Sequence, residues 1–119
     1  MIDIKDYVYQ HLSMASAPVH YHYPPENTAL PCISYYEAEN RVYAQTDTKE
    51  HLSEISFVVD IWSKNATKNA ELGLEVDTAL SDAGFKRMFA YDLYEPETKV
   101  HHKTMRYRVL STQDGELYQ

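Results

Sequence analysis

The hydrophobic pattern changes period once, and the change divides the centre of the chain into a strand and a helix. From Glu54 to Trp62 apolar and polar side chains alternate, as they do in a strand with one buried face. After Asn65, apolar residues recur every three or four positions, as in an amphipathic helix. Asn65 is a favourable N-cap, and Gly84 suits the residue just past the helix end. The segment therefore predicts a strand, a turn and a helix.

Shorter patterns predict the remaining elements. Apolar residues at helical spacing predict a first helix over 3–14, with Asp3 as its cap and Pro18 blocking its continuation. Alternating stretches predict strands over 19–23, 32–44, 52–62, 85–92 and 99–111. The polar stretch from Arg41 to His51 predicts an extended hairpin loop. Residues 112–119 are expected to be a flexible tail.

The resulting order, α-β-β-β-α-β-β, predicts an α+β fold in a single domain over 1–119. The sheet is expected to have five strands and to be mostly antiparallel. The third strand, second helix and fourth strand form a crossover, which should be right-handed. If the fifth strand lies between them, the unit is a split β-α-β, the sheet order is 1-2-3-5-4, and both helices cover the face of Phe57.

The opposite face of the sheet gives the best clue to function. Val58 and Trp62 make it partly apolar, and it lies among strands rich in tyrosine, of which the chain has 11. Partly apolar faces of this kind often contact another chain. We expect Trp62 to be buried either by this face or by a subunit contact. The pattern favours a binding or assembly protein over an enzyme.

Asp60 lies on the same face, and Arg106 and Arg108 share one face of the last strand. If the third and fifth strands are neighbours, Asp60 meets one of these arginines across the sheet. Two interpretations remain open, a buried acid with a functional role and a structural ion pair. The pattern favours the ion pair.

Charge and cysteine content exclude several classes of site. The formal net charge is -7, which disfavours nonspecific binding to duplex DNA because such binding relies on Lys and Arg. The single cysteine, Cys32, excludes an intrachain disulfide and a cysteine-rich zinc site. One cysteine fits a protein of the reducing cytoplasm, and the N-terminal segment lacks the apolar core expected of a signal peptide. No apolar stretch approaches the ~18 residues of a membrane span.

The remaining residues form no recognisable catalytic or metal-binding motif. His20 and His22 lie two apart on one side of a predicted strand and so converge, but His101 and His102 point to opposite faces, and no third ligand follows from spacing. The three glycines are not clustered as in a phosphate-binding loop, and no G-x-S-x-G motif is present. We expect no metal, no cofactor and no catalytic residue.

Three segments, "LPCISYYEAEN", "ISFVVDIWSKNATKNAELGLEVDTAL" and "GFKRMFAYDLYEPETKVHHKTMRYRV", resemble the tail-completion, or tail-terminator, proteins of long-tailed bacteriophages and prophages. The resemblance covers roughly 1–111. It rests on a D-x-W-S pattern and a Y-E-x-x-T…H-x-x-x-R-Y pattern, formed here by Asp60, Trp62 and Ser63 and by Tyr94, Glu95, Thr98, His102, Arg106 and Tyr107.

The resemblance implies a structural protein of phage assembly without enzyme activity or cofactor. Such proteins form a hexameric ring that caps the tail tube, stops its polymerisation and joins the tail to the head connector, while DNA passes through without specific binding. The chain would act in the host cytoplasm during assembly and then in the virion. The alternatives are a head-side neck protein and a small ligand-binding or enzymatic α+β domain. The residues expected at a subunit or partner interface are Arg41, Tyr43, Asp47, Lys49, Glu50, His51 and Trp62.

Overall fold

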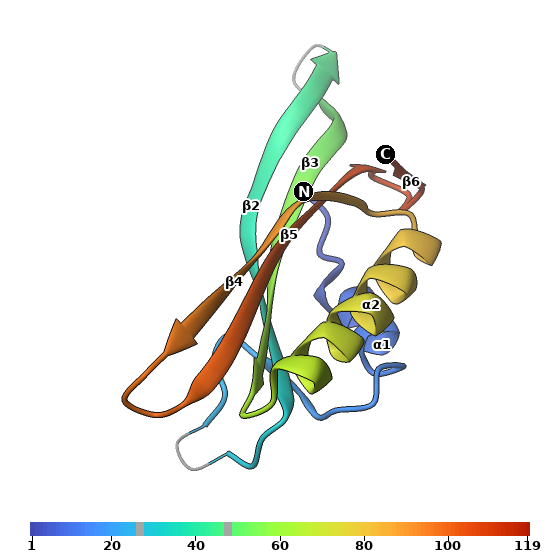
Figure 1. Ribbon diagram of the computed structural model, residues 1–119. Helices are drawn as coiled ribbons and strands as arrows, with labels where there is room; N and C mark the ends of the chain where they lie inside the picture. Colours follow the sequence, from blue (N-terminus) through green and yellow to red (C-terminus); the bar gives the residue numbers. More distant parts are fainter. Residues whose placement is uncertain (26–27, 47–48) are drawn as a thin grey trace.

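The computed structural model describes residues 1–25, 28–46 and 49–119, and of residues 46 and 49–51 the backbone alone. Within these residues, two helices and six strands follow one another (Figure 1). They are α1 (Lys5–Leu12), β1 (Val19–Tyr21), β2 (Cys32–Thr46), β3 (Lys49–Ser63), α2 (Ala66–Asp82), β4 (Lys86–Glu95), β5 (Val100–Thr112) and β6 (Leu117–Tyr118).

The strands form one sheet in the order β1-β2-β3-β5-β4, with β6 beside β5. Among the described strands, β1 and β2 are parallel and the other pairs are antiparallel. Because β5 lies between β3 and β4, the unit β3-α2-β4 is a split β-α-β. The predicted α+β class, the sheet order and the split unit are all confirmed.

Both helices lie on the same side of the sheet (Figure 1). The alternation of β3 places Ile55, Phe57, Val59 and Ile61 on this side, each fully buried. They pack with Val8 and Leu12 of α1, with Leu72, Val76 and Leu80 of α2, and with Met105, Tyr107 and Val109 of β5. The helices therefore cover the face of Phe57, as the sequence predicts.

Helix α2 begins and ends at the predicted signals. Asn65 is its N-cap, and the side-chain Oδ1 accepts a hydrogen bond of 2.9 Å from the amide of Lys68. Gly84 follows the C-cap with φ +100°, a conformation that favours glycine. The amide of Phe85 then donates to the carbonyl of Leu80, which closes a Schellman motif and turns the buried Phe85 ring into the core.

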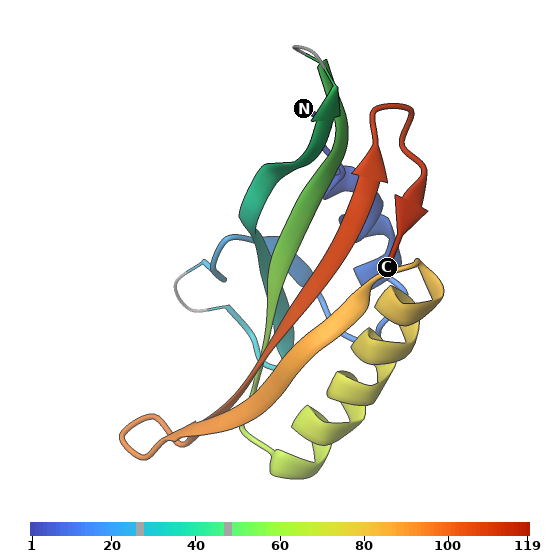
Figure 2. The ribbon, with the colours of Figure 1, turned by 90° about the horizontal axis from the view of Figure 1, so that it is seen from above.

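Helix α1 is shorter than the predicted 3–14, and its N-cap is Ile4 rather than Asp3. The Asp3 carboxylate still accepts a hydrogen bond of 3.0 Å from the amide of Lys5. The chain end also differs from expectation. Strand β6 lies within the segment expected to be a flexible tail, and it pairs with Leu110 and Ser111 of β5 (Figure 2).

The largest difference from the sequence-based prediction is in the hairpin of β2 and β3. The expected loop from Arg41 to His51 is mostly strand, because β2 reaches Thr46 and β3 starts at Lys49. The pairing register shifts at three points between Glu37 and Gln45, where bulges bend the hairpin. The long hairpin gives the molecule a length of 53 Å against 24 and 21 Å in the other directions.

Candidate assembly surface

The side of the sheet opposite the helices, which we call the open face, is covered by no described helix (Figure 1). Strand alternation places on it the side chains that lie between those of the core. They include Ser34, Tyr36 and Arg41 of β2, Glu54, Ser56, Val58, Asp60 and Trp62 of β3, His102, Thr104, Arg106 and Arg108 of β5, and Phe89, Tyr91 and Leu93 of β4.

A cluster around Trp62 occupies one end of the open face. The Trp62 ring is half-buried and stacks on His102 with the ring centroids 3.8 Å apart. Its Nε1 donates a hydrogen bond of 3.0 Å to Ser34 Oγ. His102 Nε2 lies 2.7 Å from the Oδ1 atom of Asp60, a carboxylate that is only 5% exposed. The cluster fixes the orientation of Trp62 and satisfies the buried acid.

The prediction of an ion pair between Asp60 and an arginine was wrong. Asp60 lies opposite Thr104 in the register, so His102 and Arg106 are both its diagonal neighbours on β5. The structure pairs Asp60 with His102. Arg108 instead binds Glu54, with 2.9 Å between Nε and Oε2, and no ion pair of Arg106 is found among the described residues.

Glu54 forms the second polar cluster of the open face. Its side chain is 9% exposed and bridges Arg108 of β5 and Arg41 of β2, whose Nη2 lies 2.7 Å from Oε1. Burial opposes the ionisation of Glu54, but the hydrogen bonds from the two arginines outweigh it, so the pKa lies below its ordinary value. The Arg108 guanidinium also lies over the ring of Tyr43, 6.0 Å from its centroid.

The predicted interface residues whose side chains the structure describes belong to the two clusters. Arg41 and Tyr43 belong to the Glu54 cluster and are well exposed, whereas Trp62 lies near the opposite end of β3. Asp47 lies outside the described residues. Lys49, Glu50 and His51 belong to β3, but their side chains are not described. Contact of all these residues with a partner stays a prediction.

Strand β4 carries the most exposed apolar surface, and the sequence-based prediction missed it. All ten of its residues are exposed. On the open face Phe89, Tyr91 and Leu93 are 41%, 52% and 48% exposed, whereas Tyr94 on the other side and Met88 at the register shift are each 50% exposed. The signal was present in "MFAYDLYE", which is too apolar for a solvated edge strand.

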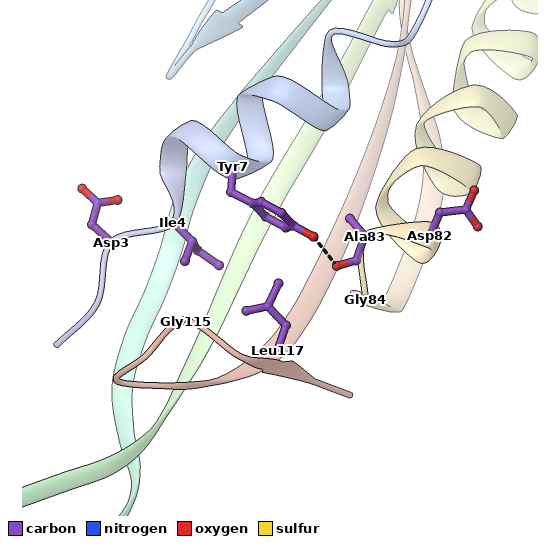
Figure 3. A pocket seen from close by; sticks show the side chains of 8 residues that line it. All are labelled: Asp3, Ile4, Tyr7, Asp82, Ala83, Gly84, Gly115 and Leu117. Carbon is purple, nitrogen blue, oxygen red and sulfur yellow. Dashed lines mark hydrogen bonds between the residues drawn. The ribbon is translucent and has the colours of Figure 1, made fainter.

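A shallow hollow lies where α1, the end of α2 and the β5–β6 turn meet (Figure 3). Its lining consists of Asp3, Ile4, Tyr7, Asp82, Ala83, Gly84, Gly115 and Leu117. The Tyr7 hydroxyl donates a hydrogen bond of 2.9 Å to the carbonyl of Ala83 and so joins the two helices. The lining contains no His, Cys, Lys or Arg side chain, and its contacts are those of a structural junction.

The polar residues that could carry other chemistry are dispersed. His20 lies in β1, but His22 follows the strand end with φ 72°, so the two do not share a strand face as expected. Among the described residues, no three His, Cys, Asp or Glu side chains are grouped so as to hold a metal ion. Cys32 is fully buried, and burial raises the pKa of its thiol to about 11. Neither helix of the described chain is long and apolar enough to cross a membrane.

Comparison with known proteins identifies the family. The family described as "Tail completion protein gp17" matches residues 8–112, whereas no curated protein sequence matches the chain. A chain of a solved structure described as "Virion of native gene transfer agent (GTA) particle" shares the fold, with a TM-score of 0.57. The two chains are 17% identical over 85% of this chain and 88% of the other. The family match spans most of the sequence and confirms the resemblance to tail-completion proteins, so this protein belongs to the tail completion protein gp17 family, a family of structural phage proteins and not of enzymes.

Proposed function

We propose that copies of this chain form a ring, most simply of six, at the head-proximal end of a phage tail tube. The ring ends polymerisation of the tube and offers the surface that joins the tail to the head connector. The observation that carries this proposal is the exposed apolar strand β4 beside the open face, in a chain whose family completes tails. Exposed apolar surface of this kind is expected of a subunit that buries it against another chain on assembly.

To cap the tube, the ring must have two different ends, one that docks on the tube and one that does not accept a further tube subunit. A tube subunit adds by docking on the exposed end of the previous layer, and the ring occupies that end without offering an equivalent one. A closed ring uses a heterologous contact, in which one patch meets a different patch on the next copy. The two polar clusters and the long β2–β3 hairpin give each copy unlike ends along its length (Figure 1).

The charge of the chain fits a conduit for DNA. Six copies at -7 each carry a formal charge of -42. Negative charge near the central opening repels the DNA backbone, whereas a basic lining would bind it and oppose passage. The partners are accordingly further copies of the chain, the tail-tube protein and a head-side neck protein. Assembly takes place in the host cytoplasm and the product resides at the head–tail junction of the virion. The likeness to a chain of a gene transfer agent virion supports a setting in a phage-like particle.

Electron microscopy of a lysate that lacks the gene tests the proposal. Loss of a terminator predicts filled heads without tails, together with free tails of irregular and excessive length. Tails of normal length that fail to join heads would contradict the terminator role and favour the neck-protein alternative. A small ligand-binding domain would instead show normal particles, and its melting temperature would rise with ligand.

A further inference from the structure

Among the described strands, the sheet has two long edges without a strand partner, one on each side. Strand β4 pairs with β5 on one side only. On the opposite side, β1 covers β2 only from Ile33 to Tyr35. From Tyr36 to Thr46, no described strand lies beside the outer edge of β2. Each copy therefore presents two rows of backbone N–H and C=O groups of similar length.

Strand β4 lacks most of the features that protect a free edge. It contains no proline, and its one described register shift lies between Arg87 and Phe89, so pairing with β5 is regular from Phe89 to Glu95. The charge of Asp92 within that stretch is taken up by Lys103, 2.9 Å away. Five of the ten residues are large apolar or aromatic side chains that are at least 41% exposed. A regular, apolar edge of this kind pairs readily with another strand, and natural proteins normally protect or cover it.

The outer edge of β2 fits as the partner of β4, and its pairing with β3 is regular from Glu39 to Val42, between two of the register shifts. It exposes apolar surface of its own at Val42 and Tyr43, which are 50% and 54% exposed. Three antiparallel steps, β2–β3, β3–β5 and β5–β4, make β2 and β4 run in opposite directions. In a ring whose axis runs roughly along the strands, β4 of one copy would therefore meet β2 of the next in antiparallel orientation. Because the two edges differ and lie on opposite sides, the contact is heterologous and closes a ring.

The free edges lie at different heights along the sheet. Strand β4 is level with the second half of β3, since both pair with β5 between His101 and Arg108. The free part of β2 is level mainly with the first half of β3, from Lys49 to Val58. The two edges can meet between copies only if the strands are tilted against the ring axis. Tilts of about 35–45° are normal in closed sheets.

We propose that the outer edge of β4 pairs antiparallel with the free edge Tyr36–Thr46 of the next copy, so that the sheets join into one continuous layer around the ring. This inference rests on the proposed ring and specifies how its copies are connected. A contact through the end of the β2–β3 hairpin would instead leave β4 uncovered.

Paired cysteines test the contact in assembled particles. In a Cys32→Ala background, Tyr91→Cys on β4 is combined in turn with Glu39→Cys, Arg41→Cys or Tyr43→Cys on β2. A disulfide requires Cα atoms about 4.4–6.8 Å apart, so it reports direct pairing. We expect at least one combination to give a ladder of cross-linked multimers that ends at the ring, about 83 kDa for six chains of 13.8 kDa. The control replaces Tyr91→Cys by Leu74→Cys, which lies on α2 with 72% exposure, and should give no ladder.

The variants are made in cells where they complement a deletion of the gene, so tail length is scored in the same lysates. Normal tails without a cross-link from any combination would overturn the strand pairing and leave the proposed function standing. Dimers formed by Tyr91→Cys alone would indicate a two-fold β4–β4 contact and also overturn it. Tails of normal length in the uncomplemented deletion would refute the terminator function, whatever the cross-links show.

A charge placed on the edge gives an independent readout. Leu93→Lys puts a lysine in the middle of the regular part of β4, whereas Leu74→Lys makes the same change on the exposed surface of α2. We expect Leu93→Lys to lower the amount of assembled ring at least tenfold with the circular dichroism spectrum unchanged, and Leu74→Lys to assemble normally. Equal assembly of the two variants would contradict the proposal.

Discussion

Strands β3 and β4 belong to the same sheet but meet opposite surroundings. From Ser53 to Ser63 every residue of β3 is buried except Trp62, which is half-buried. Every residue of β4 is exposed, although its sequence is as rich in large apolar side chains. Strand β3 lies between β2 and β5 and beneath the helices, whereas β4 has a neighbour on one side only.

The difference separates what holds the single chain together from what is left for assembly. Burial of apolar side chains is the main stabilising contribution to folding, and in this chain the buried cluster includes four residues of β3 and none of β4. Exposed apolar groups on β4 contribute little to the stability of one copy. The comparison therefore predicts that substitutions in β3 change the stability of the monomer, whereas substitutions in β4 change assembly.

The sharpest test of this separation compares two phenylalanines. Phe57 on β3 is fully buried, and Phe89 on β4 is 41% exposed. We expect Phe57→Ala to lower the free energy of unfolding by about 3–5 kcal/mol, because it leaves a cavity in the core. Phe89→Ala should change it by less than about 1 kcal/mol. Urea unfolding of the monomer measures both, and equal losses would break the comparison.

Trp62 should combine the two behaviours, because it belongs to β3 but faces the open side. Trp62→Ala removes the stack on His102 and the hydrogen bond to Ser34. We expect a loss of about 2–3 kcal/mol, below that of a fully buried aromatic residue, and a defect in ring assembly. The measurements are urea unfolding and light scattering. A Trp62→Ala protein that is stable and fully assembled would show that Trp62 acts neither in the fold nor in an interface.

The Glu54 cluster makes part of the stability dependent on pH. The pKa of Glu54 is lowered in the fold, so its contribution is present above the pKa of the unfolded chain and is lost as pH falls through the folded pKa. We expect Glu54→Gln to cost about 1–3 kcal/mol at pH 7. The cost should shrink below about pH 4. Glu39→Gln is the matched control, because that more exposed carboxylate lies 3.7 Å from the same Arg41. A pH-independent difference would contradict the ion-pair origin.

The smallest expected effect is on the reactivity of Cys32, at the covered end of β2. The thiol is fully buried and its pKa is raised to about 11, so only about one molecule in a thousand carries a thiolate at pH 8. A thiol reagent should label the native protein very slowly and the urea-unfolded protein at once. Rapid labelling of the native protein would show that this end of the sheet opens.

The sequence predicts the centre of the fold better than its edges. The alternation from Glu54 to Trp62 and the caps at Asn65 and Gly84 are local signals, and local hydrogen bonds satisfy them in the structure. The extended β2–β3 hairpin could not be predicted in the same way. The sequence of its outer half is mostly polar, so the alternation that marks a strand with a buried face is absent.

Side-chain partners across strands depend on register, which the sequence does not determine here. Opposite Thr104, Asp60 has two diagonal neighbours of basic character, His102 and Arg106, and residue type alone does not choose between them. The stack on Trp62 holds the His102 ring beside the carboxylate. The exposure of β4 was missed for a different reason, because a strand rich in apolar residues is normally predicted to be buried.

Hydrogen exchange of the free chain and of the chain in assembled tails tests the central claim, that β4 is the surface left for assembly. In the free chain, the amides of β3 should exchange slowly, and those of β4 that point away from β5 should exchange rapidly. On assembly the account predicts strong protection of the β4 amides with little change in β3. Exchange in β4 that remains as fast in assembled tails as in the free chain would contradict it.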